Sequence, residues 1–137
     1  MIVVDTNIIA YMAFSTPQSP KVTALYEMDS DWETVSFWKS EFLSVVSLYF
    51  RKRIVTYDEA LIAIDYAEKL INVHEHRISP LAVMALIRDS NCSAYDCEFV
   101  ALALELEAKL ITYDREVLKE FPRIALKPED FIAQSQQ

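Results

Sequence analysis

Residues 1–7 read MIVVDTN, and this stretch decides the fold. Residues 2–4 form an apolar run without alternating polar positions, which predicts a strand buried on both faces of a parallel sheet covered by helices. The run ends at Asp5. A carboxylate directly after a central strand lies at the carboxyl edge of the sheet, where open α/β folds bind their ligands. Asp5 is an equally good N-cap for a helix over residues 8–13, so a helix cap and a catalytic residue are both open interpretations.

Outward from this strand, segments with strand-like and helix-like apolar patterns alternate along the chain. Further strands are predicted over residues 33–37, 72–77, 109–112 and 123–126, and further helices over residues 21–28, 39–53, 56–71, 80–87, 95–107 and 115–121. This alternation predicts an α/β fold, a three-layer α/β/α domain with a mostly parallel central sheet. No repeat or linker divides the chain, so we expect one domain over residues 1–137 with a frayed tail over residues 134–137.

The composition excludes several functional classes. The chain has 137 residues and is 53% hydrophobic, enough for a buried core. It contains no glycine, which excludes the glycine-rich phosphate loops of nucleotide-binding folds. The net charge of −8 argues against nucleic-acid binding through a broad basic surface, but not against an acidic cleft that holds metal. No apolar run reaches the ~18 residues of a membrane span and no signal peptide precedes Asp5, so we expect a cytoplasmic protein without a membrane partner.

The cysteines and histidines support no functional prediction. Cys92 and Cys97 are expected to be buried thiols in a reducing compartment. His74 and His76 would point to the same face of a strand. Their spacing from the cysteines matches no zinc-binding pattern, so we assign them no role.

The informative residues are four acids, each at a strand end or on an apolar helix stripe. Asp114 follows the strand over residues 109–112 just as Asp5 follows the first strand. Glu41 and Asp96 each lie on an apolar stripe of a helix. Each acid also has a purely structural explanation, because Asp96 and Asp114 can cap helices and Glu41 can interact with a helix dipole.

Taken together, the four acids are harder to explain as caps alone. Parallel connectivity would gather them at one edge of the sheet. Buried carboxylates normally neutralise, pair or bind a metal, and the sequence offers few bases beside them apart from Arg115. Hard divalent cations prefer oxygen ligands and can activate water for attack on a phosphodiester. The residues alone therefore predict a metal-dependent phosphodiester hydrolase, with Arg115 as a candidate for a phosphate contact.

The sequence around these acids resembles PIN-domain ribonucleases, and among them the VapC-type toxins of type II toxin–antitoxin pairs. The matching blocks are VVDTN at residues 3–7, SE at 40–41, SAYDCEFVALA at 93–103 and LITYD at 110–114. The resemblance implies a parallel sheet flanked by helices, a Mg²⁺ or Mn²⁺ site, endonucleolytic cleavage of RNA, a homodimer and silencing by a small antitoxin protein. Family members often have a glycine before the fourth acid's strand, where residues 107–109 are EAK here. The geometry of that turn is therefore in question.

The resemblance also assigns roles position by position. Asp5 and Asp96 would be the principal metal ligands. Glu41 and Asp114 would complete the set of four catalytic acids and help to place the attacking water. The supporting polar residues would be Thr6, Asn7 and Thr112.

Two alternative functions remain open. A housekeeping PIN nuclease would act in RNA maturation without an antitoxin. A non-enzymatic phospho-acceptor or docking module would also place acids at strand ends, but that class usually has a lysine after a late strand, where residues 112–114 are TYD here.

Overall fold

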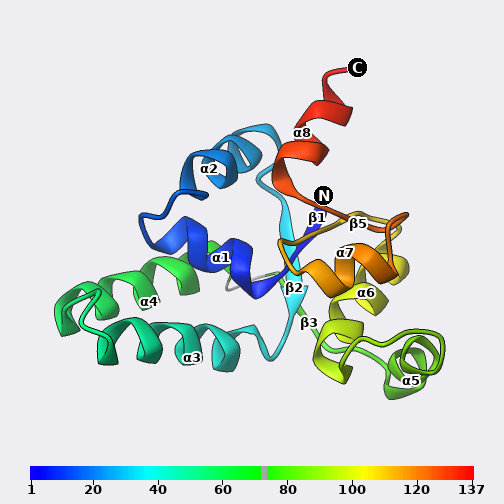
Figure 1. Ribbon diagram of the computed structural model, residues 1–137, viewed down its shortest axis with the longest axis horizontal. Coiled ribbons are helices and arrows are strands. Elements are labelled where there is room, and N and C mark those ends of the chain that lie inside the picture. Colours follow the sequence, from blue (N-terminus) through cyan, green and yellow to red (C-terminus); the bar gives the residue numbers. More distant parts are fainter. Residues whose placement is uncertain (72–73) are drawn as a thin grey trace.

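The computed structural model describes residues 1–71 and 74–137, and a five-stranded sheet lies at its centre (Figure 1). The strands are β1 (Ile2–Val4), β2 (Trp32–Val35), β3 (Glu75–His76), β4 (Leu110–Ile111) and β5 (Ala125–Leu126). The helices are α1 (Thr6–Ala13), α2 (Ser19–Met28), α3 (Trp38–Arg51), α4 (Tyr57–Ile71), α5 (Pro80–Arg88), α6 (Ala94–Leu106), α7 (Arg115–Glu120) and α8 (Pro128–Ser135). The strand order is β3-β2-β1-β4-β5, and all four pairings are parallel.

Helices cover both faces of the sheet. Helices α1 to α4 lie on one side, and α5 and α6 lie on the other (Figure 1). Ile2 and Val4 of β1 pack into one core with α1 to α4, whereas Val3 packs into a second core with α5 and α6. All three side chains are buried, as expected for a strand covered on both faces. The predicted α/β/α fold with a parallel sheet is confirmed.

The register of β1 against β4 sets which residues meet at the edge of the sheet. Val4 pairs with Ile111, and the backbone N–H of Asp5 donates to the carbonyl oxygen of Ile111 at 3.0 Å. On the other side of β1, Val3 pairs with Glu33 of β2. Because the strands are parallel, the residues that directly follow β1 and β4 lie next to each other at the carboxyl edge.

The turn between α6 and β4 has a backbone conformation typical of glycine, although no glycine is present. Glu107 adopts a left-handed backbone conformation with φ 52° and ψ 40°. Its backbone N–H donates to the carbonyl oxygens of Ala103 and Leu104. Helices commonly end in this way at glycine, because a Cβ atom costs about 1–2 kcal/mol in that conformation. The absence of glycine at this turn therefore adds backbone strain.

All four strands predicted after the first are shorter in the structure, and β4 and β5 each lose two of the four predicted residues. β2 ends at Val35 instead of Phe37, because Phe37 is already the N-cap of α3. Of the strand predicted over residues 72–77, Glu75 and His76 pair with β2. Residues 72 and 73 lie outside the described residues.

A helix that the sequence pattern does not predict, α8, follows the last strand. Pro128 occupies the first turn of α8, where its missing N–H is not needed. The helix includes Gln134 and Ser135, the first two residues of the tail expected to be frayed. Phe131 and Ile132 pack against the core formed with α1 to α4.

Cys92 and Cys97 are buried free thiols, as expected. None of the helices in the described part of the chain is long enough and apolar enough to span a membrane. A capping box begins α4, because Thr56 and Glu59 each accept a hydrogen bond from the other's backbone N–H, at 3.1 and 2.9 Å.

The strained turn gives a stability prediction. Glu107→Gly should raise the free energy of unfolding by about 1 kcal/mol, because glycine adopts the left-handed conformation without a Cβ clash. The control is Glu105→Gly in the exposed part of α6, which should lower the free energy of unfolding by about 1 kcal/mol. Urea denaturation measures both variants. A destabilised Glu107→Gly would show that the turn is not strained.

Candidate active site

Asp5 serves both as a helix cap and as a member of the acidic site. Its Oδ1 accepts a hydrogen bond of 2.7 Å from the backbone N–H of Thr6, and it is the N-cap of α1. Its Oδ2 accepts a hydrogen bond of 2.7 Å from Oγ1 of Thr112, the residue that follows β4. The residue is only 7% exposed. The two interpretations of Asp5 are therefore compatible.

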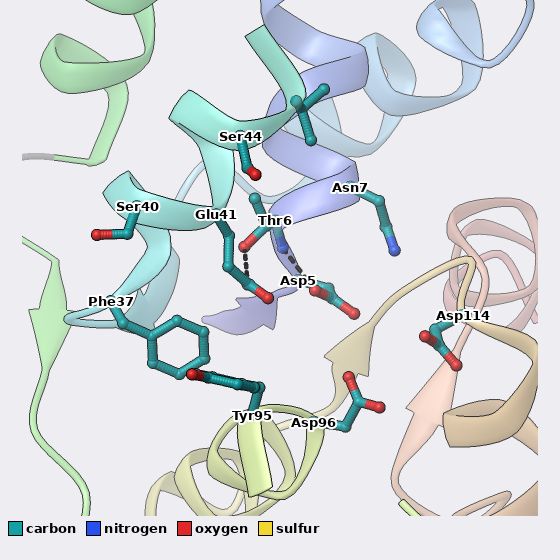
Figure 2. Close-up of a pocket in the computed structure, with 11 residues that line it drawn as sticks. Asp5, Thr6, Asn7, Phe37, Ser40, Glu41, Ser44, Tyr95, Asp96 and Asp114 are labelled. Atoms are coloured by element: carbon teal, nitrogen blue, oxygen red, sulfur yellow. Dashed lines mark hydrogen bonds between the residues drawn. The ribbon is translucent and has the colours of Figure 1, made fainter. Parts of the chain in front are cut away.

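Glu41 reaches the same place from the first turn of α3. Its Oε1 accepts a hydrogen bond of 2.7 Å from Oγ1 of Thr6. Thr6 thus links the two acids, because its backbone N–H contacts Asp5 while its hydroxyl contacts Glu41. Figure 2 shows both hydrogen bonds and the carboxylates of Asp5 and Glu41 directed toward the same space.

Asp96 and Asp114 complete the site from the starts of two further helices. The backbone N–H of Asp96 donates to Oγ of Ser93, the N-cap of α6, at 3.1 Å. Asp114 is the N-cap of α7, and its Oδ1 accepts from the backbone N–H groups of Glu116 and Val117 at 2.9 and 3.1 Å. Both helix starts hold their acids at the carboxyl edge of the sheet, where Asp5 also lies.

The four acids surround one cavity of about 650 Å³ (Figure 2). No described lysine or arginine lines it. The lining residues are Asp5, Thr6, Asn7, Phe37, Ser40, Glu41, Ser44, Val45, Tyr95, Asp96 and Asp114. Chain segments far apart in sequence thus bring the predicted carboxylates together.

Burial and mutual repulsion make three of these acids reluctant to ionise. Desolvation raises the pKa of Asp5 to about 7, with smaller increases from the charges of Glu41 and Asp96, against the lowering effect of its hydrogen bonds. Burial likewise raises the pKa of Glu41, and Asp96 and Glu98 add to the increase. Burial also raises the pKa of Asp96, with a contribution from Asp114. Without a bound cation, the carboxyl groups of this cavity therefore tend to hold their protons.

The donor set fits a hard divalent cation. Apart from the phenol of Tyr95, every ionisable group lining the cavity is a carboxylate, the ligand type that Mg²⁺ and Mn²⁺ prefer. Among the described residues, the acids of this cavity do not place three ligand oxygens within 4.8 Å of one another. Mg²⁺ needs no closer grouping, because it usually takes one or two carboxylates and fills its other positions with water and substrate oxygens.

The predicted supporting residues differ in how they relate to the cavity. Asn7 lines it, and its Nδ2 donates to Oγ1 of Thr112 at 3.4 Å while its Oδ1 accepts from the backbone N–H of Tyr113 at 3.3 Å. Thr112 lies behind the cavity wall, where it is fully buried and bonded to Asp5. Arg115, the first residue of α7, is exposed and does not line the cavity.

Sequence reasoning missed several wall residues of the cavity. Phe37 and Val45, each four residues from Glu41 along the chain, pack against the cores and also line the cavity. The same i, i+4 spacing could have identified the α3 wall once Glu41 was placed in a site. Tyr95 is 61% exposed, and its ring centroid lies 5.2 Å from that of Phe37 in an edge-to-face arrangement (Figure 2). The two rings form an aromatic rim beside the acids.

Comparisons with known proteins agree with this architecture. Residues 2–125 match the model of the PIN domain family. PAE2754 from Pyrobaculum aerophilum has a similar fold, with a TM-score of 0.70 and 17% identity over 99% of this chain and 97% of that one. FitAcB from Neisseria gonorrhoeae gives a TM-score of 0.69 and 16% identity over 94% of this chain and 99% of that one. At these identities the two structures show the fold alone. No curated protein sequence matches the chain significantly.

The raised pKa of Asp5 predicts a pH-dependent stability of the metal-free protein. Between the ordinary value of 3.8 and about 7, the folded state keeps a proton that the unfolded state has lost. The free energy of unfolding should therefore fall as pH rises through this window, by up to about 1.4 kcal/mol per pH unit for one proton. Asp5→Asn should remove this part of the slope, because an amide does not titrate. Urea denaturation with a chelator measures both proteins, and parallel pH profiles would contradict the assignment.

Proposed function

We propose that this chain, which belongs to the PIN domain family, is a Mg²⁺-dependent endoribonuclease that hydrolyses RNA phosphodiester bonds. PIN domains are generally metal-dependent nucleases. The observation that carries the proposal is the convergence of Asp5, Glu41, Asp96 and Asp114 on one cavity in which no described base neutralises them. Mn²⁺ has the same oxygen preference and is the natural substitute.

The four acids take different roles in this proposal. Asp5 and Asp96 would hold the cation, which when bound neutralises a phosphodiester and lowers the pKa of water beside it. Glu41 and Asp114, on opposite sides of the cavity, would orient the attacking water and accept its proton at a carboxylate oxygen. The hydroxyl of Thr6 donates to Oε1 of Glu41, which leaves its other carboxylate oxygen to accept that proton.

The threonines and Asn7 would fix the positions of the reacting groups. Thr6 donates to Glu41 and Thr112 donates to Asp5, so each hydroxyl leaves its carboxylate one defined orientation. Asn7 connects Thr112 to the backbone N–H of Tyr113, directly before Asp114. This network links three strand and helix ends and would hold the acids within the small tolerance that catalysis requires.

The RNA would contact the rim of the cavity. The rings of Phe37 and Tyr95 offer a surface on which a base next to the scissile phosphate can stack. Arg115 is exposed next to Asp114 and would contact a neighbouring phosphate. With a net charge of −8, the chain would depend on such local contacts and on the cation to hold RNA.

The resemblance to VapC-type toxins supports a finer proposal, that the protein is a homodimeric toxin silenced by a small antitoxin. Exposed apolar side chains on α3 and α4, including Leu43, Leu61 and Ile62, offer area for a protein partner. A cavity of about 390 Å³ beside them is lined mainly by apolar residues, among them Phe14 and Tyr49.

Substitution of the metal ligands tests the enzymatic proposal. Asp5→Asn and Asp96→Asn should each reduce RNA cleavage in Mg²⁺ by at least ~100-fold, because even partners outside the ligand set commonly cost 10–100-fold. Glu41→Gln and Asp114→Asn should also reduce the rate. Circular dichroism checks that each variant folds. Asp58→Asn, at an exposed acid in the first turn of α4, is the matched control. Full activity of a ligand variant would remove that residue from the mechanism.

Expression in cells tests the toxin proposal separately. Brief induction of the wild-type protein should arrest growth and create new RNA 5′ ends that sequencing can map. Asp96→Asn should do neither, because it lacks a ligand. Cleavage of RNA in the tube without any effect on growth would keep the nuclease and reject the toxin, leaving a housekeeping role.

A further inference from the structure

A second group of cation-binding side chains lies at the amino end of the sheet, away from the acidic cavity. Asp31 directly precedes β2, Glu33 lies within β2, and His74 directly precedes β3. One potential ligand atom from each residue lies within 4.8 Å of the other two. The parallel pairing of β2 with β3 explains the grouping, because residues before neighbouring parallel strands share an edge.

Glu33 is the central residue of this group. Its side chain is 13% exposed, and its Oε1 lies 3.2 Å from Nε2 of His76. Its Oε2 lies 2.6 Å from Nδ1 of His74, yet it is buried and takes part in no hydrogen bond with any described residue. The two atoms are therefore close without the alignment that a hydrogen bond needs. A cation between a carboxylate oxygen and an imidazole nitrogen would satisfy both lone pairs.

We propose that Asp31, Glu33 and His74 bind a divalent cation of the Zn²⁺ type. Zn²⁺ takes imidazole nitrogen and carboxylate oxygen at about 2.0–2.2 Å, so tetrahedral ligand atoms lie roughly 3.4 Å apart. Nδ1 of His74 lies 3.8 Å from Oδ1 of Asp31, close to that value, whereas Nδ1 and Oε2 of Glu33, 2.6 Å apart, would have to separate to admit the ion. The side chains of His74 and Asp31 are 37% and 53% exposed, which gives the ion an entry path and leaves a position for water.

The ligand types separate this site from the acidic cavity. An imidazole ligand favours Zn²⁺ and its neighbours over Mg²⁺, whereas the cavity offers oxygen ligands alone. His76 would act on Glu33 through Oε1, in the way that residues behind a ligand commonly fix its orientation. A bound ion would join β3, an edge strand of two residues, to β2 and to the turn before it.

The two histidines of the chain allow a direct test. Zn²⁺ is titrated into the full chain carrying Asp5→Asn and Asp96→Asn, which removes the proposed ligands of the other site. Nitrogen-15 NMR of the imidazole rings and calorimetry follow binding. One equivalent of Zn²⁺ should shift Nδ1 of His74 to the range of a metal-bound nitrogen, change His76 less, and raise the Tm by mass action. The same concentration of Mg²⁺ should leave both rings unchanged.

Variants distinguish a built site from a surface histidine. His74→Gln and Glu33→Gln should each weaken Zn²⁺ binding by at least ~10-fold, and Asp65→Asn, an exposed acid paired with Lys69, should not change it. Here the parent is the chain with Asp5→Asn and Asp96→Asn only. Equal Zn²⁺ binding by the parent and by its Glu33→Gln variant would overturn the proposal. Imidazole rings that stay unshifted in the parent would also overturn it, and misfolding of a site variant could not explain that result. No readout uses RNA cleavage, so the outcome is independent of the proposed function.

Discussion

The pairing of β1 with β4 is the constraint on which the acidic site depends. β1 is buried on both faces, so Asp5 has no freedom to swing into solvent. Its carboxylate loses water and recovers only two hydrogen bonds, from Thr6 and from Thr112 at the end of β4. The uncompensated part of this desolvation is visible in the pKa of about 7. A site that favours a cation follows from placing an acid at the end of a fully buried strand.

Helix capping is compatible with the proposed cation binding at Asp5 and Asp114, the two acids that are N-caps. A capping carboxylate is held by backbone N–H groups, and the positive end of the helix dipole favours its charge. Asp114 uses only Oδ1 for both of its capping contacts, with Glu116 and Val117. The cap therefore holds the side chain in place without using Oδ2. The choice between cap and catalyst, which the sequence left open, does not arise in the structure.

What the sequence could predict was set by patterns within single segments. The unalternated run over residues 2–4 correctly predicted a strand covered on both faces, and acids at parallel strand ends had to share an edge. The sequence did not place Phe37 and Val45 at the cavity, because a cavity wall and a core are both apolar at helical spacing and these two residues belong to both. The closeness of Glu33 and His74 depends on pairing between strands about 40 residues apart, which no local spacing reveals.

Under the two proposals, a bound cation would have a different effect at each edge of the sheet. The chain carries 21 acidic and 13 basic side chains, and four of the acids surround the cavity. RNA phosphates would meet repulsion there until a cation reversed the local charge, so the ion would serve substrate binding as well as chemistry. At the amino edge, an ion beside Glu33 and His74 would lie next to no RNA-cleaving group. It would act instead on the pairing of β3 with β2, the strand that leads directly into Phe37 and Glu41 on the cavity wall.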